Sequence, residues 1–215
     1  MAAPACRTTI SSRWRQWPPF ANRLKANQVL VVIPSRVEAD FLAADHAGSL
    51  KEAAQDLVEG CLLAGASIRF TVSTTSMLPT LRPGDALIVE GEAAAGVRSG
   101  EMVVIRNGNT WVVHRLIRRK VSGERYCFVT KGDNRRLADP GFDATAPVGV
   151  VKRIQRGEES IDLETWQAKY GGRVLAWLSA VQAELWAPET GLFRRLITNG
   201  LQRGIYRLAW LVYKI

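Results

Sequence analysis

Three residue types that together form a nucleophilic site occur in the central part of the chain, at Ser76, His114 and Asp139. A serine hydroxyl is a weak nucleophile until a neighbouring base accepts its proton. Imidazole suits this task near neutral pH because its unperturbed pKa is about 6.5, whereas a lysine amine, at about 10.4, first needs burial to lower its pKa. A carboxylate can then hold the other ring nitrogen. The set predicts nucleophilic catalysis if the fold brings it together, and Asp133 competes with Asp139 for the carboxylate's place.

The serine lies in residues 71–85, TVSTTSMLPTLRPGD, directly after a β-favouring run. Pro79 fixes its own φ and restricts the residue before it, so we expect a strand that ends in a stiff turn. Such a turn would hold the Ser76 hydroxyl in place. The alternative is that Ser76 only helps to form the turn.

His114 lies in an alternating run that predicts a strand with Val112, His114 and Leu116 on one face. A strand histidine can also be purely structural. Asp133 sits in a Gly-Asp-Asn turn, and Asp139 precedes a proline, where an Asx-turn is the alternative to a role beside the imidazole.

Three short motifs therefore follow one another: Ser-Met-Leu-Pro at 76–79, His-Arg at 114–115, and Gly-Asp-Asn at 132–134 with Asp139 downstream. In this order they resemble the type I signal peptidases, in particular the endoplasmic-reticulum and archaeal type in which histidine is the base. A more distant resemblance is to the LexA-like peptidases. The resemblance covers roughly residues 68–151.

The resemblance implies a role for each residue of the site. Ser76 would be the nucleophile, His114 the general base and Asp139 the carboxylate that orients it. Asp133 would brace the site, and the Thr74 hydroxyl would support the oxyanion together with the Ser76 N–H.

The implied activity is that of a serine endopeptidase that processes signal peptides, cutting an extended peptide or preprotein after a small residue. Two alternatives stay open. One is a LexA-like protease that cleaves itself, with Ala47-Gly48 as the candidate bond. The other is a non-catalytic peptide-binding or membrane-docking module of the same fold.

Positive charge gathers at the two ends of the chain. Residues 1–36, 37–170 and 171–215 carry net charges of +6, −1 and +4, which sum to +9. We therefore expect the C-terminal segment, basic and rich in Leu, Ile, Trp and Tyr, either to lie on an anionic membrane surface or to cap the sheet. No recognised motif indicates nucleic acid, and the oligomeric state stays open.

Other site classes have little support in the sequence. Two histidines and three widely spaced cysteines argue against a metal centre or a disulfide framework, and we expect no cofactor. No stretch reaches the ~18 to 20 apolar residues of a transmembrane helix, so a peripheral membrane or cytoplasmic protein is expected. Type I signal peptidases normally have a transmembrane anchor ahead of the serine motif, so the sequence departs from the pattern of that family here.

The fold class expected is a mainly β core of the signal peptidase and LexA type, with an N-terminal amphipathic helix and a C-terminal helical extension. The domains expected are a basic tail with a short strand (1–45), the catalytic domain (46–157) and the helical extension (158–215). A capping box at Ser49 and Glu52 predicts the start of the first helix, which ends near Gly65.

Period-two alternation and intervening turn signals predict strands at 68–73, 86–90, 102–106, 110–117, 125–130 and 148–154. The Asn-Gly-Asn of residues 107–109 predicts a tight hairpin. Helices are expected at 163–170, 173–186 and 192–215. A break at Gly171-Gly172 is expected to separate the first two.

Overall fold

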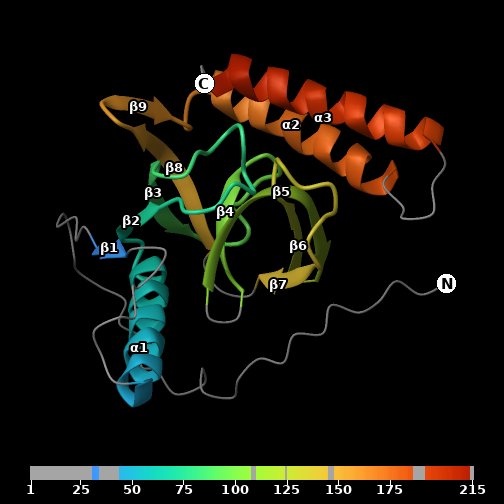
Figure 1. Cartoon of the computed structure of the whole chain (residues 1–215). Coiled ribbons are helices and arrows are strands. Elements are labelled where there is room, and N and C mark those ends of the chain that lie inside the picture. Colours follow the sequence, from blue (N-terminus) through green and yellow to red (C-terminus); the bar gives the residue numbers. More distant parts are fainter. Residues whose placement is uncertain are drawn as a thin grey trace.

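The structure is a computed structural model, and it describes residues 31–33, 44–107, 110–123, 125–144, 148–185 and 192–213. The predicted tail at 1–28 and residues 108 and 109 of the predicted turn lie outside these residues. Figure 1 shows a curved sheet with one helix at its side and a pair of long helices packed at another edge.

In the described residues the elements follow this order: β1 (Val31–Ile33), α1 (Ala44–Leu63), β2 (Ser67–Thr71), β3 (Ala86–Glu92), β4 (Met102–Asn107), β5 (Thr110–Ser122), β6 (Arg125–Lys131), β7 (Phe142–Ala144), β8 (Val148–Arg156), β9 (Glu159–Asp162), α2 (Trp166–Leu185) and α3 (Leu192–Tyr213).

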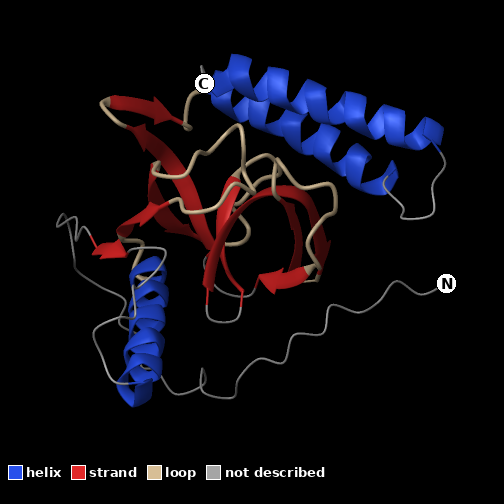
Figure 2. Ribbon diagram, in the orientation of Figure 1, coloured by secondary structure: helices blue, strands red, loops and turns tan. Residues whose placement is uncertain are grey.

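The strands form one sheet in the order β1-β2-β3-β8-β4-β5-β6-β7, with β9 paired to β8. Every pair is antiparallel except β1 with β2. The sheet curls on itself into a barrel-like body (Figure 2). The prediction of a mainly antiparallel β core with helices is therefore confirmed.

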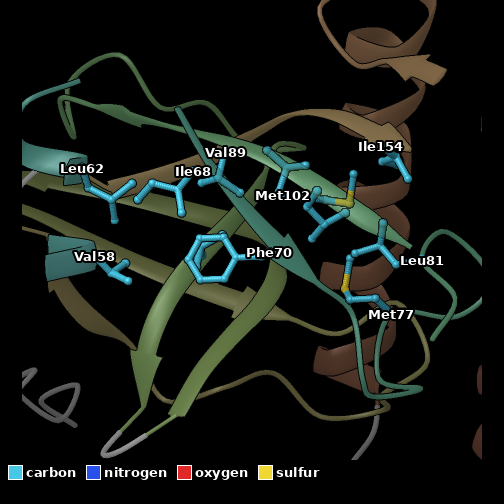
Figure 3. Close-up of a cluster of buried hydrophobic side chains, with 12 residues drawn as sticks. Val58, Leu62, Ile68, Phe70, Met77, Leu81, Val89, Met102 and Ile154 are labelled. Carbon is cyan, nitrogen blue, oxygen red and sulfur yellow. The ribbon is translucent and has the colours of Figure 1, made fainter. Parts of the chain in front are cut away.

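Two apolar clusters lie on the two faces of the sheet. Successive residues of a strand point to opposite faces, so the neighbours Val103 and Val104 belong to different clusters. The first cluster joins α1 to the sheet through Val58 and Leu62 and extends to Met77 in the turn after β2 (Figure 3). Each buried side chain of this size contributes about 1.5–3 kcal/mol. The cluster therefore anchors that turn as well as the sheet.

The six predicted strands are confirmed in position, but two strands were missed. β7 has three residues, too few to show a period. β9 has Ile161 as its one apolar residue, and it forms because Gly157, at φ 58°, turns the chain back onto β8. Tertiary pairing therefore supplies what the local pattern lacks.

The predicted start of the first helix was wrong, because α1 begins at Ala44, five residues before Ser49. The capping-box signal lies inside the helix. Serine and glutamate are tolerated in a helix interior, so the signal does not prevent the helix from continuing upstream.

The predicted break at Gly171-Gly172 was also wrong, because α2 runs through both residues. A Cβ at Gly171 would lie 2.3 Å from a methyl group of Val212, and one at Gly172 would lie 2.8 Å from the carbonyl oxygen of Gly100. The two glycines therefore allow α2 to approach α3 and the β4 side of the core closely.

Gly200 and Gly204 likewise do not interrupt α3. It packs on α2 through a small cluster that includes Leu175, Ile205 and Ala209. No helix in the described part of the chain combines the length and apolar character needed to cross a bilayer.

Candidate active site

The serine turn is held at both of its ends. Gly84 N–H donates to the carbonyl of Val72, and Leu81 N–H donates to that of Met77, at 2.8 and 3.0 Å. Met77 and Leu81 are almost fully buried in the first cluster (Figure 3). Ser76, just before this anchor, is half-buried and so reachable from solvent.

His114 on β5 lies between the serine and a carboxylate. Its Nε2 is 3.2 Å from Oγ of Ser76, and its Nδ1 is 2.5 Å from Oδ2 of Asp139. The imidazole is almost completely buried, whereas the Asp139 side chain is about a quarter exposed. Three residues from a turn, a strand and a loop thus form one hydrogen-bonded chain.

Asp139 is fixed by Thr130 at the end of β6. The Thr130 hydroxyl donates to Oδ2 at 2.8 Å, and the Asp139 N–H donates to the Thr130 carbonyl at 2.8 Å. Burial alone would raise the pKa of Asp139, but the hydrogen bond and charge of His114, with the Thr130 hydroxyl, bring that pKa below its ordinary value. The carboxylate is therefore ionised at neutral pH.

The Gly-Asp-Asn turn packs directly against the serine turn. Asn134 N–H donates to the Ser76 carbonyl at 2.9 Å, and the Asn134 amide donates to the Thr75 carbonyl at 3.1 Å. A Cβ at Gly132 would lie 2.6 Å from the Ser76 carbonyl oxygen and 3.1 Å from Nε2 of His114. Glycine at 132 is therefore what lets the two turns and the imidazole meet.

Thr74 lies beside the serine. Its hydroxyl is 3.3 Å from Oγ of Ser76, and its side chain is exposed. This places a second hydroxyl at the open side of the site.

Asp133 has a different partner from Asp139. Its two carboxylate oxygens accept from Nε and Nη2 of Arg115 at 2.9 and 2.7 Å, and Oδ2 also accepts from the Thr80 hydroxyl at 2.5 Å. Both side chains of the ion pair are fully buried. Burial alone would lower the pKa of the guanidinium, but Asp133 raises it instead. In the described residues, the carboxylate that contacts His114 is Asp139 and not Asp133.

Helix α3 supports this turn from the far end of the sequence. Gln202 donates to the Asp133 carbonyl at 2.9 Å, and the Tyr206 hydroxyl donates to the Asn134 side chain at 2.5 Å. No local pattern in the sequence indicates this role, because the partners lie 69 and 72 residues apart.

Lys131 is a second group beside the site whose role the sequence did not indicate. It is fully buried, and its ammonium group donates to the Gly132 carbonyl at 3.3 Å. Burial lowers its pKa to about 8, with a contribution from Arg115, while Asp133 and Asp139 act in the opposite direction. An ionisable amine thus lies next to the site without a close carboxylate contact among the described residues.

The described residues contain no group of three or more metal-binding side chains. Cys61 and Cys127 are unpaired. What this arrangement can do chemically is activate a hydroxyl by proton transfer to an imidazole.

Residues 41–134 match the family model described as Peptidase S24-like. This points to a serine peptidase of the general type that includes the LexA-like and signal peptidases. The matched segment is somewhat less than half of the chain; it contains Ser76, His114 and Asp133 and ends before Asp139. Comparison with curated proteins and with solved structures found no match for the chain.

Proposed function

We propose that the chain is a serine endopeptidase of the signal peptidase kind, with Ser76 as nucleophile, His114 as general base and Asp139 as the carboxylate that orients it. The observation that carries the proposal is the hydrogen-bonded chain from Oγ of Ser76 through the two ring nitrogens of His114 to Asp139. The Peptidase S24-like match over the serine and histidine motifs supports it.

In the proposed reaction, Oγ of Ser76 attacks the carbonyl carbon of the scissile peptide while its proton passes to Nε2 of His114. The Asp139 carboxylate holds Nδ1–H and stabilises the imidazolium. The imidazolium then protonates the leaving amine, and water, activated by the same ring, hydrolyses the acyl-enzyme. The Ser76 N–H and the Thr74 hydroxyl are the groups proposed to stabilise the oxyanion, which needs donors already in place.

The proposed substrate is an extended peptide or preprotein segment with small side chains on the acyl side of the cut bond. Backbone pairing to a strand edge supplies affinity in such complexes, and shallow pockets select the side chains. The exposed side chains of Ser73, Thr74 and Thr75 leave the approach to Ser76 open.

The test is cleavage of a fluorogenic Ala-x-Ala peptide by the full chain, compared with Ser76→Ala. We expect the variant to lose activity by at least a thousandfold, because the acyl-enzyme cannot form. Ser73→Ala, an exposed serine three residues away, is the matched control and should cleave like wild type. Equal cleavage by Ser76→Ala would rule the proposal out, and peptide binding without cleavage by wild type would favour the non-catalytic module.

Self-cleavage is the second candidate, since the matched family includes self-cleaving proteases. Ala47-Gly48 lies within α1, so this bond would have to leave the helix before it could enter the site as an extended segment. Intact-mass measurement after long incubation at alkaline pH tests this candidate. Only full-length chain in wild type, with peptide cleavage retained, would dismiss it.

A further inference from the structure

The hairpin of α2 and α3 carries most of the large apolar side chains that the described residues expose. Six of the ten lie there, each between 39% and 73% exposed: Trp166, Tyr170, Trp177, Ile197, Trp210 and Leu211. Exposed apolar side chains scattered singly need no explanation, but a gathered set marks an interaction surface.

Helix α2 buries mostly small and polar side chains, together with Leu175, and exposes its aromatic ones. Its buried positions are Ala168, Gly171, Gly172, Leu175, Ala176, Ser179 and Gln182. Trp166, Tyr170 and Trp177 recur at helical spacing on the opposite side. A helix that served only to cap the sheet would bury its aromatic residues, so capping alone does not account for α2.

Helix α3 also has one buried side and one exposed side. Tyr213 and Ala209 are buried, whereas Trp210 and Leu211 are exposed on the other side. The two helices lie side by side (Figure 1).

The charge of the hairpin has one dominant sign. Helices α2 and α3 contain six basic residues, Lys169, Arg173, Arg194, Arg195, Arg203 and Arg207, and one acidic residue, Glu184. Glu184 pairs with Arg118 of β5. Arg173, Arg203 and Arg207 are exposed and form no ion pair with any described residue.

We propose that the six exposed apolar side chains, with Arg173, Arg203 and Arg207, form a docking face that lies in the plane of an anionic bilayer surface. Tryptophan and tyrosine favour the boundary between lipid tails and headgroups. Arginine can lay its stem along apolar surface while its charge reaches the anionic headgroups. A second copy of the chain fits less well, because two such basic faces repel each other.

Docking in this way would also orient the candidate active site. The side of α3 that faces the core holds the turn at 132–134 through Gln202 and Tyr206, and this turn holds the Ser76 carbonyl through Asn134. These contacts therefore fix the position of Ser76 relative to the docking face. The docking itself does not depend on whether Ser76 is catalytic.

Vesicle flotation of the full chain tests the proposal. We expect strong binding to phosphatidylcholine vesicles that contain a quarter phosphatidylglycerol, roughly hundredfold weaker binding to phosphatidylcholine alone, and weakening with added salt. The double variant Arg203→Glu and Arg207→Glu should lose at least roughly thirtyfold in binding to the anionic vesicles, since each basic residue near such a surface adds about 1 kcal/mol. Trp177→Ser with Trp210→Ser should lose about tenfold on the same vesicles.

Each double variant has a control elsewhere in the chain. Val121→Ser with Leu137→Ser removes two apolar side chains of similar exposure, and Lys120→Glu with Arg125→Glu makes the same change in net charge. Both controls should bind within twofold of wild type, with unfolding transitions showing that every variant is folded. Equal losses in the controls, equal binding to both vesicle types, or a dimer in light scattering that Trp177→Ser with Trp210→Ser abolishes would each overturn the proposal.

Discussion

The hydroxyl of Tyr213, the last residue of α3, lies 3.1 Å from Nη1 of Arg115, the residue next to His114 in β5. The same guanidinium group binds Asp133 and the carbonyl of Gly100, and it lies over the Tyr213 ring. Because these contacts join the end of the chain to the strand that carries the imidazole, α3 forms part of the framework of the candidate site.

We expect Tyr213→Phe to lower the free energy of unfolding by about 1 kcal/mol. One hydrogen bond is lost, while the ring stays in place and Nη1 still donates to the Gly100 carbonyl. Urea unfolding measures the difference. Tyr170→Phe, which changes an exposed ring in α2, is the control, and the same loss in both variants would contradict the assignment.

Replacing Asp139 with asparagine should lower kcat for peptide cleavage by roughly 10³–10⁴ and change KM much less, because the imidazole loses its orienting partner but the substrate contacts remain. Steady-state kinetics with the fluorogenic peptide measures this. Asp56→Asn, an exposed carboxylate in α1, should leave kcat unchanged. A KM effect without a kcat effect would assign Asp139 to substrate binding instead.

The pH dependence of stability has a definite sign at Asp139. Its pKa is lower in the folded protein than its ordinary value of about 3.9, so its ionisation stabilises the fold fully above that value. The stabilisation is lost as pH falls through the folded pKa. The difference in unfolding free energy between wild type and Asp139→Asn should therefore shrink as pH falls below about 4.

For Lys131 the sign is opposite. Its pKa falls from 10.5 to about 8, so the folded state disfavours the charged amine by about 3 kcal/mol below pH 8, and this cost disappears as pH rises towards 10.5. Lys131→Met should exceed wild type in stability by up to about 3 kcal/mol at pH 7, with the gap closing by pH 10. Urea unfolding at both pH values, with exposed Lys120→Met as control, measures this. A gap that does not change with pH would contradict it.

Gly132→Ala should lower kcat/KM by about 10²-fold, because the added methyl meets the Ser76 carbonyl and His114 Nε2, and small displacements of reacting groups cost this much. Gly200→Ala is the matched control. A Cβ there meets nothing within 4 Å, so this helix position should gain about 1 kcal/mol in stability with activity unchanged. Full activity in Gly132→Ala would show that the turn can shift to accommodate the methyl group, and it would contradict the prediction.

Much of the fold was predictable because strand alternation and turn chemistry are local. The register pairs Asn107 with Thr110, as the hairpin predicted from Asn-Gly-Asn requires. The wrong predictions fell where contacts override local preference. Gly171 and Gly172 remain helical because their missing side chains admit Val212 and Gly100, and neither neighbour is close in sequence.

For the candidate site, too, the sequence indicated some features and left others to the tertiary structure. Arg115 lies on a strand face that is otherwise apolar, which was a signal that its charge needed a buried partner. The other residues of that face are Trp111, Val113 and Ile117. The identity of that partner could not be read from the motif, since Asp133 and Asp139 are both near in sequence to the same turn. The pairing of β5 with β6 decides which aspartate meets Arg115. His114 and Arg115 are neighbours in β5, so their side chains point to opposite faces of the sheet.

The sequence by itself therefore determined which side chains are present for the chemistry and which short segments carry them, because side-chain reactivity and backbone periodicity are properties of neighbouring residues. Only the tertiary structure decided that Asp139 faces His114, that Asp133 pairs with Arg115, and that α3 supports the second pair from the far end of the sequence. These choices depend on contacts between residues 18 to 98 positions apart, and such contacts exist only once the sheet has curled and the helical hairpin has packed on it.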